Sequence, residues 1–210
     1  MKATLFADGE AVSPALRNLL RRGRFVVALD GAAERVRREG WKPNLVAGDF
    51  DSVRPATLRY FERRGVALLP TPDQNFTDLE KALAWCALRD FESIWIAGAL
   101  GGRLDHSFSA LSLLRRYFEP GRELVLFHGR DRVRFLRDEK VRLSGRAGRR
   151  IAVLPFPRCR ARSRGLVYEL TDTALDLGVR ESVSNAARLA TVALYVKGEA
   201  LVVEEGDWRA

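Results

Sequence analysis

Apolar residues in the first part of the chain follow two alternating patterns. Short, wholly apolar runs recur, and the stretches between them carry apolar residues at helical spacing. These patterns are typical of strands buried on both faces and of amphipathic helices. The predicted strands are 3–6, 25–29, 45–47, 66–69, 94–97 and 124–127, and the predicted helices are 14–22, 32–39, 55–64, 78–89 and 106–118. Right-handed crossovers then give an α/β fold with a doubly wound, mainly parallel sheet.

The pattern changes after about His128. Helical periodicity disappears, and short alternating segments follow at 133–136, 141–143, 151–154, 191–196 and 200–203. Turn signals separate these segments at Ser144-Gly145, at Pro155 and Pro157, and at 197–199. The second part therefore predicts a small antiparallel β domain. We expect an α/β domain over residues 1–128 and the β domain over 129–210.

The composition suits a soluble protein, with 47% hydrophobic and 30% charged residues. No apolar run approaches the ~20 residues of a membrane helix, and Met1–Asp8 predicts a short strand rather than a secretory signal. The two cysteines, Cys86 and Cys159, form no C-x-x-C pair, which argues against a zinc site or a disulfide framework. We expect a cytoplasmic protein.

The net charge of +9 comes mainly from arginine and raises the question of an anionic partner. Arg158, Arg160, Arg162 and Arg164 alternate along the chain and would form a cationic stripe on one strand face. Such a stripe can serve a nucleic-acid-binding or regulatory protein. We favour an exposed strand face whose small alternate residues, 159, 161 and 163, point inward. The other arginines are scattered, so nucleic acid is an unlikely partner.

Polar or glycine-bearing loops follow four of the predicted strands. These loops are 30–33, 48–52, 70–78 and 98–106. In an open α/β sheet, ligands bind beyond the carboxyl ends of the strands, and all four loops lie at that edge. Their convergence predicts a binding site there.

Asp49 and Asp51 flank Phe50 at the end of one strand. Residues two apart on a strand point to the same side, so both carboxylates can face one site. Two adjacent carboxylates repel unless a cation lies between them, and Mg²⁺ is the natural candidate beside phosphates. A solvated Asp-x-Asp turn would explain the same residues without a metal.

A capping box starts the helix predicted from Asp78. Thr77 is the expected N-cap with Glu80 three residues on, and the buried stripe would be Leu79, Ala82, Leu83 and Cys86. Asp78 lies in the first turn, where a carboxylate is favoured, and Lys81 can share its edge of the helix. A capped helix explains much of this segment, but not the polar approach 71–74 that precedes it.

Gly98, Gly101 and Gly102 lie between a buried strand and a helix, where missing Cβ atoms let the backbone approach phosphate. Arg103 adds a guanidinium fork, and Asp105 can accept from a ribose or cap the helix. His106 carries no catalytic assignment of its own. Together the loops supply ligands for a metal and for polyphosphate but no nucleophile, which suits phosphoryl transfer.

These stretches resemble the thiamine pyrophosphokinase (thiamine diphosphokinase) family. The similar segments, in the family's order, are 30–33, 48–52, 71–81 and 101–106, with weaker pieces at 164–168 and 182–185. The resemblance implies a homodimer with an α/β nucleotide domain and a β-sandwich domain. It also implies the reaction, in which ATP and thiamine give AMP and thiamine diphosphate with Mg²⁺.

The resemblance also implies roles by position. The metal ligands would be Asp49, Asp51 and Asp78, and Asp73 and Lys81 join them as catalytic residues. The ATP-binding residues would be Asp30, Gly31, Gly101, Gly102, Arg103, Asp105 and His106. Thiamine would be held by Gln74, Thr77, Ser182, Ser184 and Asn185, the last three across the dimer interface. Asp73 and Asp78 are both candidates for taking the alcohol's proton, and the reaction can also proceed without a base.

Three positions depart from the family pattern. Glu34 and Ala110 stand where asparagine is usual, and Ala186 stands where glutamate often follows the Ser-Asn pair. The first two concern the nucleotide side and the third the acceptor side. These departures leave open the alternative that the acceptor is another hydroxymethyl heterocycle, such as a pterin.

Overall fold

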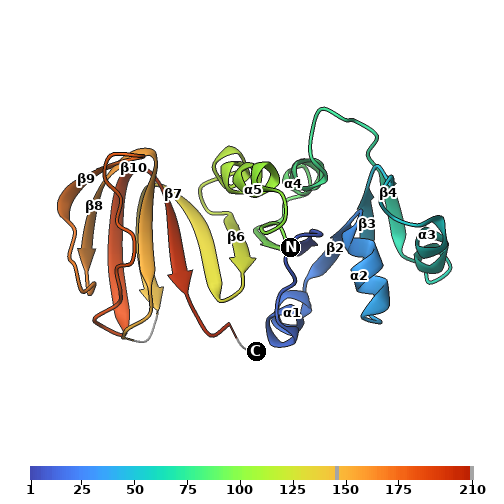
Figure 1. The fold of residues 1–210 in the computed structure, drawn as a ribbon, viewed down its shortest axis with the longest axis horizontal. Coiled ribbons are helices and arrows are strands. Elements are labelled where there is room, and N and C mark those ends of the chain that lie inside the picture. The colour runs from blue at the N-terminus through green and yellow to red at the C-terminus, as the bar shows by residue number, and fades with distance from the viewer. Residues whose placement is uncertain (145–146, 209–210) are drawn as a thin grey trace. The chain divides into compact units, whose positions relative to one another are not determined.

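The computed structural model of the chain describes residues 1–144 and 147–208 (Figure 1). Contacts divide it into two compact units. Residues 1–129, together with Trp208, form what we call the α/β unit, and residues 130–207 form the β unit.

The α/β unit holds a parallel sheet in the order β4-β3-β2-β1-β5-β6. Its strands are β1 (Lys2–Phe6), β2 (Phe25–Leu29), β3 (Leu45–Gly48), β4 (Ala67–Pro70), β5 (Ser93–Ala97) and β6 (Glu123–His128). Its helices are α1 (Pro14–Arg21), α2 (Ala32–Arg38), α3 (Pro55–Glu62), α4 (Asp78–Ala87) and α5 (Leu104–Arg116). Figure 1 shows α4 and α5 over one face of the sheet and α1 and α2 over the other.

The strand order confirms the predicted doubly wound arrangement. The chain moves outward from β1 to β4 and then returns to the other side of β1 with β5. Every predicted helix and strand of this unit is present, with ends shifted by a residue or two. The order reverses between β1 and β5, which is where open α/β sheets bind their ligands.

The β unit contains an antiparallel sheet in the order β7-β10-β8-β9. Its strands are β7 (Asp131–Ser144), β8 (Ile151–Arg164), β9 (Thr171–Asp176) and β10 (Thr191–Glu205). Leu166, Leu170 and Ala187, from the connections around β9, share a buried core with sheet residues such as Val153 and Val202. The connections thus form a second apolar layer on one face of the sheet.

Two predicted interruptions of the β unit were wrong. The turn expected at 197–199 is a bulge within β10, where the register against β7 shifts between Val196 and Glu199. Gly198 suits this bulge, because its φ is +95° and an added Cβ would lie 2.7 Å from the carbonyl oxygen of Arg158. The predicted segments 191–196 and 200–203 therefore join into one strand, as do 133–136 and 141–143.

The turn expected at the two prolines is also absent, because β8 runs through Pro155 and Pro157. β8 meets β9 only from Arg158 onward, and its register against β10 is broken at the same place. Pro155 lies opposite Ala200 of β10 and Pro157 falls in the break, but neither is paired with β9, so their missing N–H groups cost no hydrogen bond between β8 and β9. The remaining predicted turn, at Ser144-Gly145, extends beyond the described residues.

The arginine stripe lies on an exposed face of β8, while Cys159 and Ala161 between its members are buried. Arg160 and Arg162 both pair with Asp172, at 2.8 and 3.4 Å. Arg158 lies 3.9 Å from Asp176. The interpretation as an exposed strand face is confirmed, and carboxylates around β9 balance much of its charge.

Both cysteines are unpaired and buried. Burial raises the pKa of the Cys86 thiol to about 12 and that of Cys159 to about 11, so neither is a reactive thiolate. Within residues 1–144 and 147–208, no helix has the length and apolarity needed to cross a membrane.

Candidate functional site

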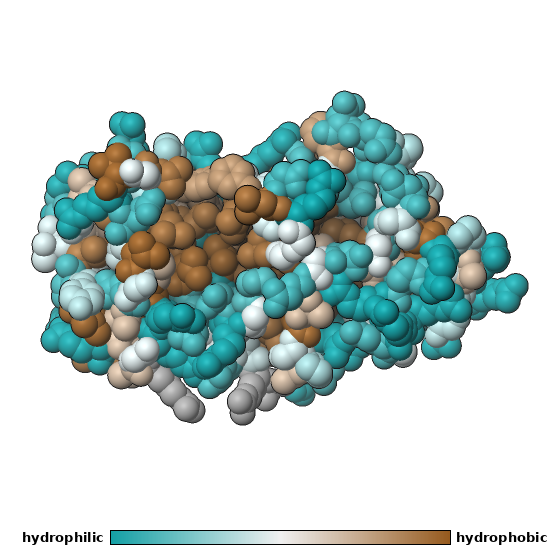
Figure 2. All heavy atoms as spheres, in the orientation of Figure 1, coloured by the Kyte–Doolittle hydropathy of each residue, from teal (hydrophilic) through white to brown (hydrophobic). Residues whose placement is uncertain are grey.

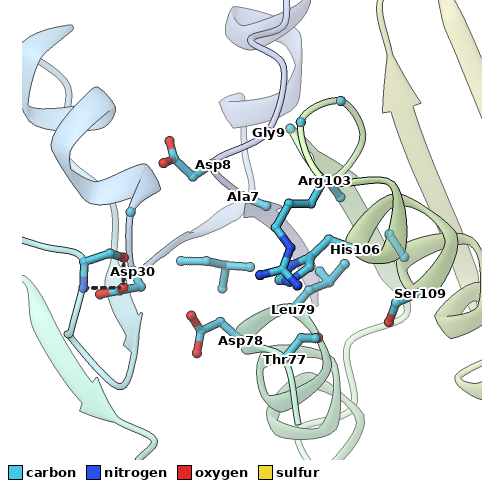
Figure 3. A pocket seen from close by; sticks show the side chains of 18 of the residues that line it. Ala7, Asp8, Gly9, Asp30, Thr77, Asp78, Leu79, Arg103, His106 and Ser109 are labelled. Carbon is cyan, nitrogen blue, oxygen red and sulfur yellow. Dashed lines mark hydrogen bonds between the residues drawn. The ribbon is translucent and has the colours of Figure 1, made fainter. Parts of the chain in front are cut away.

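A pocket of about 420 Å³ opens at the carboxyl edge of the parallel sheet (Figure 3). Its walls come from the loops after β1, β2, β3 and β5 and from the first turns of α4 and α5. The lining includes Asp8, Asp30, Gly31, Asp49, Ser52, Thr77, Asp78, Gly101, Gly102, Arg103, His106 and Ala110. The pocket therefore lies where the strand order reverses, as the strand-end loops predicted.

Backbone hydrogen bonds join the loops that follow β1 and β5. Gly9 N donates to Gly98 O at 2.6 Å, and Glu10 N donates to Leu100 O at 2.8 Å. A Cβ on Gly98 would lie 2.4 Å from Ala7 O, and the φ of Gly98 is +69°. Glycine is needed at this position for loop packing rather than for a ligand.

Gly102 differs from Gly98, since an added Cβ would meet no atom within 4 Å. Its φ is +78°, a backbone conformation that favours glycine. Its backbone faces open space in the pocket wall, immediately before Arg103 and the start of α5. This part of the loop is open to solvent and leaves room for the phosphate expected at the glycine loop.

Asp49 and Asp51 are brought together by a turn and not by strand geometry, which corrects the reasoning from alternation. β3 ends at Gly48, and Phe50 has a φ of +65°. Asp51 N donates to Asp49 Oδ1 at 3.3 Å, and Gln74 Nε2 donates to Asp49 Oδ2 at 2.9 Å. The hydrogen bond from Gln74 is the main reason why the pKa of Asp49 is lowered, so this carboxylate is charged.

Asp30 is the buried carboxylate of the site, with 3% of its surface exposed. Its Oδ2 accepts hydrogen bonds from Ser52 N, at 3.1 Å, and from Ser52 Oγ. A Cβ on Gly48 would lie 2.6 Å from Asp30 Cβ, so glycine lets the next strand end lie against it. Burial raises the pKa of Asp30, and among the described residues its Oδ1 has no hydrogen-bond partner.

Carboxylate oxygens of Asp30, Asp49 and Asp51 lie within 4.8 Å of one another. Three hard oxygen donors at this spacing, one of them buried without a full set of partners, suit a divalent cation such as Mg²⁺. Asp78 is outside this group in the described structure. Figure 3 shows its carboxylate turned toward the side of the pocket where Asp30 lies, and its charge contributes to the raised pKa of Asp30.

At the first turn of α4, one of the two hydrogen bonds of the predicted capping box is formed. Thr77 Oγ1 accepts from Glu80 N at 3.3 Å. The carboxylate of Glu80 pairs with Arg116 of α5 and does not return the capping bond. The predicted stripe of Leu79, Ala82, Leu83 and Cys86 is buried, which fixes the helix against the sheet.

Lys81 and Asp73 shape the loop before α4. Lys81 Nζ donates to Thr71 O at 2.8 Å and to Asp73 O at 3.2 Å, and it pairs with Asp78 Oδ1 at 2.8 Å. Its side chain is only 9% exposed. Asp73 Oδ1 accepts from Asn75 N at 2.9 Å in an exposed turn outside the pocket lining. The structure therefore gives Lys81 a clear supporting role.

Arg103 and Asp105 form an exposed pair at the start of α5. The guanidinium donates to both carboxylate oxygens, at 3.1 and 2.5 Å. The hydrogen bond from Arg103 lowers the pKa of Asp105 to about 2. Arg103 and His106 line the pocket, whereas Asp105 is outside the lining and pairs with Arg103.

Ser182, Ser184 and Asn185 belong to the β unit. Asn185 is 2% exposed, and its amide donates to Tyr168 O at 2.7 Å and accepts from Tyr168 N at 3.1 Å. Ser184 has a φ of +57°, and Ser182 Oγ accepts weakly from Asn185 at 3.4 Å. The buried side chain of Asn185 thus fixes the turn that carries Ser182 and Ser184.

Sequence reasoning missed Asp8 and Gly9. Both line the pocket, and Asp8 pairs with Arg35 of α2 at 2.6 Å. They follow the first predicted strand, so the strand-end criterion applied to the other loops would have found them. The support that Ser52 gives to Asp30 had no comparable signal, because the two are 22 positions apart.

Comparisons with known proteins point to one family. The family described as "Thiamin pyrophosphokinase, catalytic domain" matches residues 16–126, more than half of the chain. "Thiamin pyrophosphokinase 1" of Caenorhabditis elegans is 28% identical over 207 residues, covering 90% of this chain and 83% of that protein. "Thiamine pyrophosphokinase 2" of Arabidopsis thaliana is 30% identical, covering 72% and 61% respectively.

Solved structures show the same fold. The chain superposes on thiamine pyrophosphokinase from Bacillus subtilis with a TM-score of 0.87 at 21% identity, covering 99% of this chain and 100% of that one. Thiamin pyrophosphokinase from Candida albicans gives a TM-score of 0.85 at 18% identity, covering 98% and 89%.

Replacing Lys81 by methionine tests its supporting role. Lys81→Met leaves the carbonyls of Thr71 and Asp73 without their donor, so we expect stability to fall by about 2–3 kcal/mol. Urea unfolding measures the loss, and hydrogen exchange should quicken over 71–78. Lys42, an exposed lysine of the same unit, provides the control, and Lys42→Met should change stability by less than about 0.5 kcal/mol. Equal stability of the two variants would contradict the assignment.

Proposed function

The chain belongs to the thiamin pyrophosphokinase family, and on that premise we propose that it transfers the diphosphate group of ATP to the hydroxyl of thiamine, giving thiamine diphosphate and AMP. One observation carries the chemistry. Carboxylates, open backbone and a guanidinium converge on a single pocket at the reversal point of a parallel sheet. That combination suits phosphoryl transfer, which needs mainly positioning and charge neutralisation.

ATP would occupy the pocket between the loops after β1, β2 and β5. Gly31, Gly101 and Gly102 line this part, and α5 begins beside it with no side-chain cap on its N-terminus. Arg103 would contact phosphate, and its pairing with Asp105 keeps the guanidinium at the rim. His106 lines the wall beside it.

Asp49 and Asp51 would hold Mg²⁺, with Asp30 as the third carboxylate of the group and Asp78 across the pocket. When bound, the cation would neutralise charge on the polyphosphate. Gln74 contributes through Asp49, since its amide fixes that carboxylate in place.

The acceptor side is proposed from Thr77 and Asp78 and, across the proposed dimer interface, from the β unit of a second copy of the chain. Asp78 lines the pocket and Asp73 does not, so we assign acceptance of the alcohol's proton to Asp78. Lys81 holds Asp78 by an ion pair. Ser182 and Ser184 would contact thiamine, while Asn185 supports their turn through Tyr168.

We also propose a cytoplasmic homodimer whose β unit is a sandwich. Large apolar side chains are exposed around the turn that carries Ser182 and Ser184: Val167 at 50%, Tyr168 at 72%, Val183 at 61% and Leu189 at 47%. Figure 2 shows apolar side chains gathered over the strands of the β unit. A self-complementary contact would cover such a surface. The two unpaired thiols fit a reducing compartment.

The reaction is tested by AMP release. We expect AMP to form with ATP, Mg²⁺ and thiamine together, and not when thiamine or Mg²⁺ is omitted. Asp51→Asn removes one charged oxygen ligand and should lower kcat roughly a hundredfold. Glu62→Gln changes an exposed carboxylate of α3 and should leave kcat unchanged.

The same assay with a panel of hydroxymethyl heterocycles tests the acceptor. Thiamine should saturate at the lowest concentration. If a pterin saturated at a lower concentration than thiamine, that pterin would be the acceptor. An absence of AMP with every alcohol would refute diphosphate transfer.

The dimer is tested by a charge in the exposed apolar surface. Val183→Asp places a carboxylate in the proposed contact, so light scattering after size exclusion should show monomers where the wild type gives dimers. Leu88 is 83% exposed in the α/β unit, and Leu88→Asp should remain dimeric. A monomeric wild type, or a Val183→Asp variant that stays dimeric, would contradict the proposed interface.

A further inference from the structure

Two carboxylates from one short segment hold the loop that carries Asp49 and Asp51. We call residues 49–54 the aspartate loop. Asp30, at the end of β2, accepts from Ser52 N at 3.1 Å. Glu34, in the first turn of α2, accepts from Arg54 N at 3.0 Å. The loop is therefore anchored at two backbone amides, two residues apart, immediately after Asp51.

The Glu34 anchor has a second contact. Its Oε2 accepts from the guanidinium of Arg54 at 2.6 Å, with the Glu34 side chain 22% and the Arg54 side chain 76% exposed. The hydrogen bond from Arg54 lowers the pKa of Glu34 to about 2, so the carboxylate is charged at neutral pH. Pro55 follows at the first position of α3 and fixes the direction in which the loop leaves the anchor.

Anchoring matters because the loop holds like charges close together. Carboxylate oxygens of Asp30, Asp49 and Asp51 lie within 4.8 Å of one another, an arrangement that repels itself without a cation. A loop free to move would separate Asp51, which is exposed, from the other two. A loop held in place keeps the three oxygens ready, and the cation does not have to order them on binding.

We propose that Glu34 is a positioning residue, which fixes the aspartate loop through Arg54 and thereby raises the affinity of the site for a divalent cation. This inference rests on the proposed function, since it concerns the same Mg²⁺ site. Glu34 itself is outside the pocket lining and touches no reacting group.

A negative charge near a cation site also raises affinity by simple attraction, and Arg54 separates the two explanations. Removing the Arg54 side chain deletes a positive charge, so attraction alone predicts tighter cation binding. Positioning predicts weaker binding, because the loop loses the guanidinium contact with Glu34. The backbone N–H of residue 54 still donates to Glu34. The two explanations therefore differ in sign for this variant.

The test measures Mn²⁺ binding to the whole protein, with free Mn²⁺ followed by electron paramagnetic resonance and no turnover involved. We expect Glu34→Ala to raise the Kd about tenfold and Arg54→Ala about threefold, the size expected when charged hydrogen bonds are lost. Glu34→Gln keeps an acceptor for Arg54 N and should lie between Glu34→Ala and the wild type. Glu62→Ala, which removes an exposed carboxylate of the neighbouring helix, should bind within about twofold of the wild type.

Hydrogen exchange keeps the test independent of folding. The variants should exchange faster over 49–54 and as slowly as the wild type over α4 and α5. Tighter Mn²⁺ binding by Arg54→Ala, or wild-type affinity in both Glu34→Ala and Arg54→Ala, would overturn the positioning role. A wild type that bound no Mn²⁺ would instead refute the metal assignment of the proposed function, so the two failures are distinguishable.

Discussion

The carboxylate of Asp30, buried at the end of β2, sets the geometry of the pocket. It accepts two hydrogen bonds from Ser52, and this draws the loop after β3 onto the neighbouring strand end. Gly48 makes the approach possible, because a Cβ there would overlap Asp30. A buried charge of this kind is costly unless it is compensated, and one of its oxygens still lacks a hydrogen-bond partner among the described residues. A cation beside Asp49 and Asp51 would supply that compensation.

Much of the polar chemistry around the pocket serves to hold other groups in place. Lys81 fixes the carbonyls of the loop before α4, and Gln74 fixes Asp49. Gly98 is small because the loop after β1 lies directly on it. Such supports leave fewer groups that could contact the proposed substrates, chiefly the aspartates, Arg103 and the open backbone of Gly102. A site that binds a flexible, highly charged ligand benefits from walls that are already ordered.

The sequence predicted the α/β unit well because its signals are local. Apolar runs and helical spacing located every strand and helix of this unit. The rule that ligands bind beyond the carboxyl ends of the strands located the pocket. The sequence did not predict features that depend on residues far away along the chain. Pro155 and Pro157 signal a turn, yet β8 continues through them because β9 pairs only from Arg158 onward. Likewise, Phe50 turns the aspartate loop through a positive φ that alternation along a strand could not foresee. The partnerships of Ser52 with Asp30 and of Glu80 with Arg116 are set by packing between elements and have no sequence pattern.

In the proposed function, the carboxylates at this sheet edge hold a divalent cation beside the nucleotide. Crystals grown with Mn²⁺ and a non-hydrolysable ATP analogue would test it by anomalous diffraction. We expect a strong manganese peak between Asp49 and Asp51, with the phosphates of the analogue beside it. An ordered analogue in the pocket with no manganese peak at these aspartates would refute the metal site.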